Sequence, residues 1–437
     1  MCQIESRENM QLKISNVGKI QKAEIEINGM TVIAGENNAG KSTIGKTLFS
    51  VFNSMNNMDE KIMKERKNRI YSIINRTLQG KILHNELNAS VRRRSIITVT
   101  RVLTDAVMND WSSGSIQELE NLIKEQANKT GIFDSEEDLE EFTCECTEKL
   151  EELLSITDKK VMTEVITRWF DRVFENQISP LREEQIESEV ELLVKEKKVS
   201  FAFKENACIN WESEINLLHQ AFYIDNPFVL DSLTNYSTTP RITESHLIEA
   251  LIHAQEGIYD NIFDAVMAKD KLKEIYKILG EVLKGDIVVN QNGEYYFKSN
   301  KDEKPLNIIN LSTGSKSFAL IKYLLEVGAI KDKDILILDE PEVHLHPEWQ
   351  LLYAELMVLL QRKFDLSMII TTHSPYFLDA IDVFSTKYNI SQKPHYYLAE
   401  NVGEVSVLHD VSDHIDAIYK KLSDPMQILE NLRYNRL

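Results

Sequence analysis

The pattern of apolar and polar residues predicts that the chain opens with strands. QLKIS (11–15), AEIEI (23–27) and MTVIAG (30–35) alternate or run apolar over the length of a strand. Residues 41–55 then carry apolar side chains at helical spacing, and the segment GENNAGKST (35–43) joins the third strand to this helix. We therefore expect strands, a glycine-containing loop and a helix in succession.

This loop matches Gly-x-x-x-x-Gly-Lys-Ser between a strand and a helix, the context that predicts a phosphate-binding loop. Its glycines let successive backbone N–H groups face an anion, and the helix adds its positive end. Lys41 is expected to reach the β- and γ-phosphates of a nucleotide, and the Ser42 hydroxyl to ligate Mg²⁺. The residues predicted to bind the nucleotide are Gly35, Glu36, Asn37, Asn38, Ala39, Gly40, Lys41, Ser42 and Thr43.

Helical patterns dominate from about 57 to 216, where glycine and proline become rare. Near the end of this stretch, ESEVELLV and VSFAF alternate around the charged turn KEKK (195–198), which predicts a hairpin. We predict a mainly helical insertion over 57–216, within a head made of 1–56 and 217–437. The pattern leaves open whether the strands at the end of the insertion belong to the head.

Charge within the insertion is uneven. Residues 61–101 hold eleven Lys/Arg and two acids, whereas residues 118–152 hold thirteen acids and three lysines. The basic segment, which includes Arg92, Arg93 and Arg94, predicts either a solvated face neutralised by the acidic segment or a surface that binds nucleic acid or a partner. The acidic segment is interpreted as a solvated helix face.

A globular α/β pattern returns after 216. We expect a strand and turn in AFYIDNPFVLD, helices within 244–283, a hairpin at 286–299, and a helix at 315–328 after the loop LSTGSKS (311–317). Two further strands are predicted in DILILDEPE (334–342) and SMIITTHS (367–374).

Polar side chains follow these last two strands, at the ends where open α/β sheets bind ligands. Asp339 is expected to hold Mg²⁺ through water, and Glu340 to polarise the water that attacks the γ-phosphate. His373 could contact the γ-phosphate. The segment HLHP (344–347) is not interpreted as a metal site, because no further ligand accompanies its histidines.

Composition bounds the class of protein. With 437 residues, 43% of them apolar and 27% charged, the chain is expected to form two to three soluble domains. It shows no signal peptide, no apolar run of about 20 residues and four scattered cysteines, so we expect a cytoplasmic protein without a membrane partner. A net charge of −19 argues against a surface that binds nucleic acid all over, but not against a local basic patch.

The order GENNAGKST … LSTGSKS … ILILDEPEVHLHP … IITTHSPYFL resembles the ABC-type ATPases of the SMC/Rad50/RecF group, and within it the OLD-like AAA ATPases of bacterial antiphage systems. The resemblance covers about 10–56 and 286–380, and implies an α/β P-loop NTPase of ABC/SMC-head type. In such proteins two heads sandwich two ATP molecules, each bound by the phosphate loop of one subunit and the signature loop of the other. It therefore implies an ATP-dependent dimer in which the partner subunit's nucleotide is bound by Ser312, Thr313, Gly314 and Ser315.

Departures from this family shape the functional prediction. OLD enzymes carry a Toprim nuclease after the ATPase, whereas the 64 residues that follow His373 contain no such motif. We therefore expect a separately encoded effector, most simply a nuclease, as in Septu- and PARIS-like systems. The glutamine that ABC-type ATPases place after the phosphate-loop lobe is not found, since Gln79 lies in the insertion without a supporting strand.

The sequence also bears on three other classes of protein. A transporter subunit would have about 100 residues between its nucleotide loops and a Leu-Ser-Gly-Gly-Gln signature, which this chain lacks. A DNA-repair or chromosome-organising ATPase stays open, although the insertion is short beside the coiled coils of those proteins. A scaffold that only binds ATP to hold a dimer together also stays open, although Glu340 argues against it.

Overall fold

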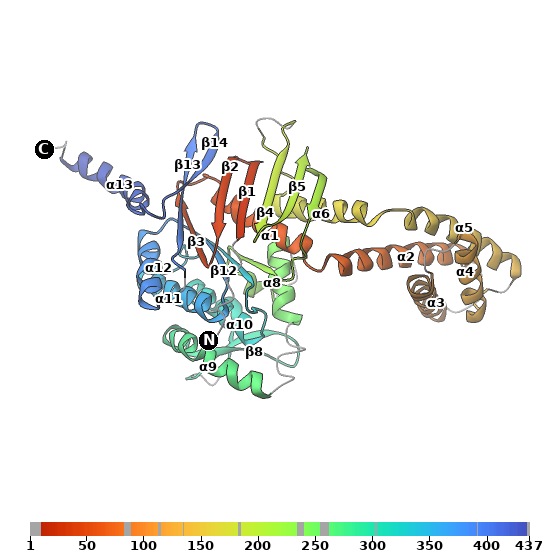
Figure 1. Cartoon of the computed structure of the whole chain (residues 1–437). Coiled ribbons are helices and arrows are strands. Elements are labelled where there is room, and N and C mark those ends of the chain that lie inside the picture. Colours follow the sequence, from red (N-terminus) through yellow and green to blue (C-terminus); the bar gives the residue numbers. More distant parts are fainter. Residues whose placement is uncertain are drawn as a thin grey trace, which may run out of the picture. The chain divides into compact units, whose positions relative to one another are not determined.

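The computed structural model describes residues 10–82, 89–111, 115–133, 135–181, 185–233, 240–253, 262–301, 304–390 and 392–434. The chain forms two compact units, a helical unit (57–165) and a head (1–56 and 166–437), both drawn in Figure 1. The helical unit thus ends at Val165, whereas the sequence placed the end of the insertion at 216. The strands between these positions pair with the sheet of the head, the arrangement that the sequence had left open.

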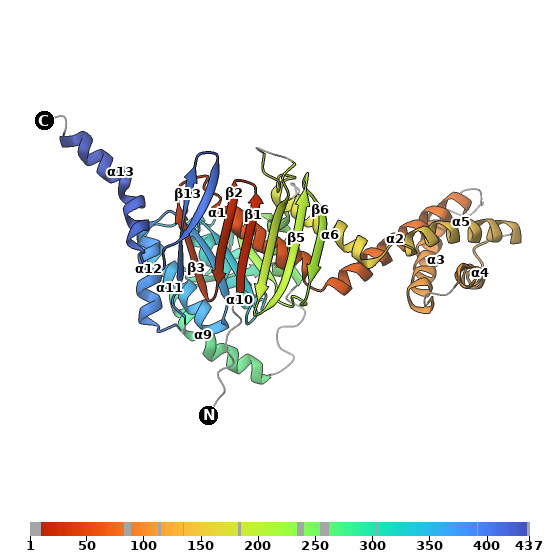
Figure 2. The ribbon, with the colours of Figure 1, turned by 45° about the horizontal axis from the view of Figure 1, so that its top comes forward.

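An eleven-stranded mixed sheet organises the described part of the head (Figure 2). Strands buried on both faces, as in MTVIAG, form its parallel part, and alternating strands form its antiparallel part. The strand order is β6 (Ala207–Ser213), β5 (Lys197–Lys204), β4 (Ser188–Val194), β1 (Met10–Val17), β2 (Ile20–Ile27), β14 (Val405–Asp410), β13 (His395–Val402), β3 (Met30–Gly35), β12 (Ser367–Thr372), β11 (Ile335–Asp339) and β7 (Ala221–Ile224).

Neighbouring strands from β13 to β7 run parallel, so their carboxyl ends meet at one edge of the sheet. At this edge lie the phosphate loop, which follows β3, the acids Asp339 and Glu340 at the end of β11, and His373, which follows β12. The predicted strands at these three places are confirmed.

Helices pack around this sheet and bury its apolar faces. The first helix packs against β3, β7, β11 and β12, and the helix predicted at 315–328 is found two residues earlier. The head helices are α1 (Lys41–Met55), α7 (Val229–Ser232), α8 (Ile242–His253), α9 (Ile262–Val282), α10 (Thr313–Glu326), α11 (Pro347–Phe364), α12 (Pro375–Lys387) and α13 (Asp416–Tyr434).

The predicted hairpin at 286–299 is confirmed as β8 (Gly285–Val289) and β9 (Tyr295–Ser299), which form a small separate sheet with β10 (Leu306–Asn307). A short 3-10 helix, η2 (Ile308–Asn310), leads from β10 to LSTGSKS (311–317), the predicted signature loop. None of the described helices carries the apolar length that spanning a bilayer requires.

The helical unit contains α2 (Met58–Ile82), α3 (Ala89–Asp110), α4 (Ile116–Thr130) and α5 (Glu136–Leu154), and α6 (Asp158–Phe174) continues from it into the head. Apolar positions three and four residues apart, such as Ile70 and Ile74 of α2, build a core of its own. The unit is therefore held together by its own packing.

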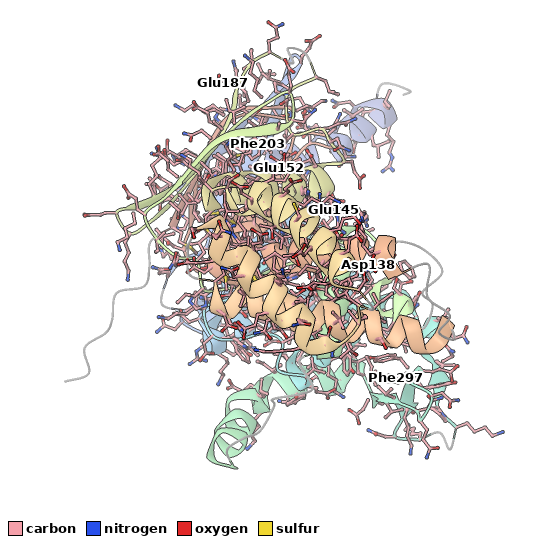
Figure 3. The ribbon with its side chains drawn as sticks, turned by 90° about the vertical axis from the view of Figure 1, so that its right-hand side faces the viewer. Asp138, Glu145, Glu152, Glu187, Phe203 and Phe297 are labelled. Carbon is pink, nitrogen blue, oxygen red and sulfur yellow. The ribbon has the colours of Figure 1, made fainter. Side chains whose placement is uncertain are left out.

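Ion pairs join the basic and acidic segments of the helical unit. Lys81 of α2, in the basic segment, pairs with Glu141 and Glu145 of α5, in the acidic segment. Figure 3 labels Asp138, Glu145 and Glu152 along α5. Part of the basic segment is thus neutralised within the unit, while the side chains of residues 92–94 lie outside the described ones.

Candidate functional site

The phosphate loop requires glycine at both of its ends. Gly35 has φ 146°, and a Cβ there would lie 2.0 Å from the carbonyl oxygen of Ala399 in β13. Gly40 has φ 77° and caps α1, and its Cβ would lie 2.8 Å from Ile20 Cγ1. The loop curls because these two positions accept backbone angles and close contacts that other residues do not.

Lys41 places a buried ammonium group over this loop. Its Nζ donates hydrogen bonds to the carbonyl oxygens of Glu36 (2.7 Å) and Gly35 (3.4 Å), and no carboxylate of the described residues forms an ion pair with it. Burial lowers the pKa of Lys41, and the nearby carboxylates of Glu340 and Asp339 oppose this shift. A buried cation whose hydrogen bonds, within the described contacts, go to carbonyl oxygens alone fits a site for a phosphate anion.

The Asp339 carboxylate accepts hydrogen bonds from hydroxyl groups of three different elements. Its Oδ1 accepts hydrogen bonds from Ser42 Oγ (3.1 Å) and Thr371 Oγ1 (2.6 Å), and its Oδ2 accepts one from the Tyr223 phenol (2.6 Å). Ser42 and Asp339, the predicted metal ligands, therefore lie side by side, and their oxygen atoms suit Mg²⁺. Tyr223 and Thr371 were not singled out by sequence, because both resemble ordinary residues of buried strands.

Glu340 stands in a strained position immediately after β11. Its φ of 51° lies in the left-handed region, and its N–H donates to Thr371 Oγ1 at 3.0 Å. The Glu340 carboxylate oxygen Oε1 lies 3.0 Å from His373 Nε2 at the end of β12. The structure thus brings together the two predicted catalytic residues, and the strain is of the kind that functional sites retain.

Glu342 is a third acid of this region, and no sequence motif singled it out. It is 6% exposed, and its Oε1 accepts hydrogen bonds from Thr372 Oγ1 and from the backbone N–H of His373, both at 2.7 Å. Burial raises the pKa of Glu342. Glu342 therefore links the turn after β11 to the end of β12. The sequence feature that could have drawn attention to it is the second glutamate of DEPE (339–342).

The predicted signature loop, LSTGSKS (311–317), lies at the start of α10. Ser312 caps this helix by accepting from the N–H of Ser315 at 3.3 Å, and a Cβ on Gly314 would lie 3.0 Å from the Trp349 ring. Thr313 is the first residue of α10. Within the described part of the chain, no hydrogen bond or ion pair joins this loop to the phosphate loop.

Other candidate features lie outside this constellation. No cluster of metal-ligating side chains occurs among the described residues, and His346 of the HLHP segment caps α11 instead. Gln79 lies in α2 and donates to Asn75. A cavity of about 630 Å³ opens beside Ile335 and Ser367, at the amino ends of β11 and β12, so it is separate from the site at their carboxyl ends.

A phosphate loop, a Ser–Asp pair and a Glu–His pair at one edge of a mixed sheet define a P-loop nucleotide-binding protein. The AAA ATPase domain family matches residues 10–378, and the chain belongs to this family. Family membership implies nucleotide binding and, together with the mixed sheet, confirms the predicted fold class, an α/β P-loop NTPase with a mainly helical insertion.

Solved structures of SMC heads resemble the chain at low sequence identity. One is an SMC head bound to the C-winged helix domain of ScpA (12% identity, TM-score 0.43, covering 92% of this chain and 98% of that chain). Another is the SMC head domain from Thermotoga maritima (11%, 0.39, 92% and 98%). A third is an SMC head with an extended coiled coil bound to the C-terminal domain of ScpA derived from Pyrococcus furiosus (12%, 0.42, 97% and 99%).

Proposed function

We propose that this protein binds ATP with Mg²⁺ and hydrolyses it at sites shared between two copies of the chain. The observation that carries the proposal is the position of Glu340, which follows Asp339 directly and lies 3.0 Å from His373. A carboxylate in this position can accept a hydrogen bond from a water molecule that attacks the γ-phosphate.

Each residue of the site has a definite task in this proposal. Backbone N–H groups of the phosphate loop and the Lys41 ammonium bind the β- and γ-phosphates. Ser42 and Asp339 would hold Mg²⁺, which neutralises charge on the transferred phosphoryl group. His373 lies beside the Glu340 carboxylate and would contact the γ-phosphate.

Exposed apolar side chains support a second copy of the chain as the other half of the site. Val343 follows the catalytic turn, Tyr376 follows His373, and Ile309 precedes the signature loop, and all three are at least 40% exposed. Apolar groups of this size around a polar site are typical of a surface that another protein covers. We propose that Ser312 and the start of α10 bind the nucleotide of that second copy.

We further propose that this ATPase serves in bacterial antiphage defence and controls a separately encoded effector, most simply a nuclease. This part rests on the resemblance of the four motifs to OLD-like ATPases. It predicts that the neighbouring gene encodes an effector that co-purifies with the ATPase.

The Glu340→Gln variant tests the catalytic proposal. Glutamine preserves the size of the side chain but accepts no proton, so ATP turnover is expected to fall by about 10²–10⁴-fold while ATP binding persists. Dimers should accumulate in the presence of ATP, as measured by light scattering. Parental turnover in this variant would exclude Glu340 as the residue that activates water.

A further inference from the structure

The phosphate loop receives contacts from a part of the chain that the family match does not cover. That match ends at residue 378, whereas β13 and α13 lie beyond it. Asn401 of β13 donates from Nδ2 to Glu36 Oε2 (3.1 Å) and to the carbonyl oxygen of Asn37 (3.3 Å). Lys421 of α13 places its Nζ 2.7 Å from Glu36 Oε1.

Lys421 is held in this place by the packing of its helix. Ile418, one turn earlier in α13, is fully buried in the core of the head, and Tyr419 donates to Asp379 of α12 at 3.2 Å. Glu400 lies 3.5 Å from the Lys421 Nζ and adds a second carboxylate to the cluster. The packing of Ile418 and the hydrogen bond of Tyr419 therefore hold the turn of α13 that places Lys421 next to the phosphate loop.

The contact resolves an electrostatic conflict within the phosphate loop. Glu36 is the second residue of a loop that must bind a polyanion, and a carboxylate there repels phosphate. The Glu36 carboxylate is ionised at neutral pH, and the hydrogen bond from Lys421 and those from Asn401 lower its pKa further, because they stabilise the charged form. The charge that the loop presents to a nucleotide then depends on whether Lys421 stays in place.

We infer that Lys421 is a positioning residue for nucleotide binding, through which the carboxyl-terminal helix sets the affinity of the phosphate loop. Lys421 neutralises Glu36 and, with Asn401, holds the backbone of the loop in its curled form. This inference rests on the proposed binding of ATP by the loop. It predicts that displacement of α13 lowers ATP affinity without any change in Lys41, Ser42 or Asp339.

A double-mutant cycle on the full-length protein tests the inference, with ATP affinity measured by titration. Lys421→Met leaves the Glu36 carboxylate without its cation, and ATP affinity is expected to fall about three- to fivefold, the size typical of a partly exposed ion pair. Adding Glu36→Gln removes the unpaired charge and should return the affinity toward that of the parent. Lys420→Met changes an exposed lysine of the same helix and is the matched control.

The outcomes separate this inference from the proposed function. If the parent does not bind ATP, the proposed function fails; if the parent binds ATP and Lys421→Met binds it equally well, only the role of Lys421 fails. A loss that Glu36→Gln does not restore would mean that Lys421 acts through general packing of α13, and would also overturn the inference. The Lys421→Met defect should shrink as salt is raised, because the pair is partly exposed.

Discussion

Replacing Glu342 by alanine should impair catalysis far more than ATP binding. The Glu342 carboxylate accepts hydrogen bonds from the Thr372 hydroxyl and the His373 N–H, and it touches neither the phosphate loop nor the signature loop within the described contacts. Alanine leaves both donors without their acceptor inside the protein. The turn that carries Glu340 then loses its link to the strand end that carries His373.

The size of the effect follows from these two hydrogen bonds. An unsatisfied buried donor costs about 1–3 kcal/mol, so losing the acceptor of both donors should destabilise the head by about 2–6 kcal/mol. A displacement of His373 or Glu340 by roughly 1 Å is enough to lower the rate about 10²-fold. Glu342→Gln keeps an acceptor oxygen of the same reach, so it should retain most of the activity.

Steady-state kinetics and denaturant unfolding measure both effects. For Glu342→Ala, we expect a large fall in kcat with a nearly unchanged KM for ATP, together with a lower free energy of unfolding. Matched kcat values for Glu342→Ala and the parent would refute the positioning role. A Glu342→Gln variant as inactive as Glu342→Ala would show that the negative charge, rather than the hydrogen bonding, matters.

The raised pKa of Glu342 also predicts a pH dependence of stability. Burial favours the protonated carboxyl, so its stabilising contribution is fully present below its ordinary pKa of 4.5 and is lost as pH rises through the higher folded value. Glutamine mimics the protonated form at every pH. The stability of Glu342→Gln relative to the parent should therefore increase between pH 4.5 and 7, as measured by urea unfolding at each pH.

Three further predictions concern other parts of the molecule. Lys41→Ala should weaken ATP binding by several kcal/mol and abolish protection against phage in cells, and equal ATP affinity in a titration would reject the phosphate-loop assignment. Tyr223→Phe removes a hydrogen bond to the Asp339 carboxylate, so the Mg²⁺ concentration for half-maximal turnover should rise about tenfold, and an unchanged Mg²⁺ titration would contradict this. Changing the arginines at 92–94 to glutamate should abolish binding of nucleic acid or of an acidic partner while sparing ATP turnover. If the variant binds both nucleic acid and the partner as the parent does, the basic segment is only a solvated face.

The parts of the site that lie in contiguous segments could be predicted from sequence. The phosphate loop and the Asp339–Glu340 pair can be recognised in the sequence, because the placement of glycines and the presence of acids after a buried strand are local patterns. The sequence predicted strands before Glu340 and before His373, but the contact between the two side chains depends on the pairing of β11 with β12, which only the structure shows.

The remaining contacts arise only when distant segments pair. Tyr223 lies 116 residues before Asp339 and looks like any buried strand residue, so no local pattern marks its hydrogen bond. Lys421 lies in a helix that the motifs do not reach, and only folding brings it to Glu36. The alternating pattern of β4 to β6 left open whether these strands belong to the insertion or to the head, because only their pairing with β1 assigns them to the sheet of the head.

The most direct test of the shared ATP site is a mixing experiment with Lys41→Ala and Ser312→Arg. The first variant lacks the cation of the phosphate loop, and the second places a bulky cation at the signature loop that should bind the nucleotide of the other copy. Each variant alone should hydrolyse little ATP, because every site in its dimer is defective. In the mixed dimer one site carries both defects and the other carries neither, so ATP turnover should reappear on mixing. Turnover that remains at the sum of the two separate variants would contradict the account, as would full turnover by Ser312→Arg alone.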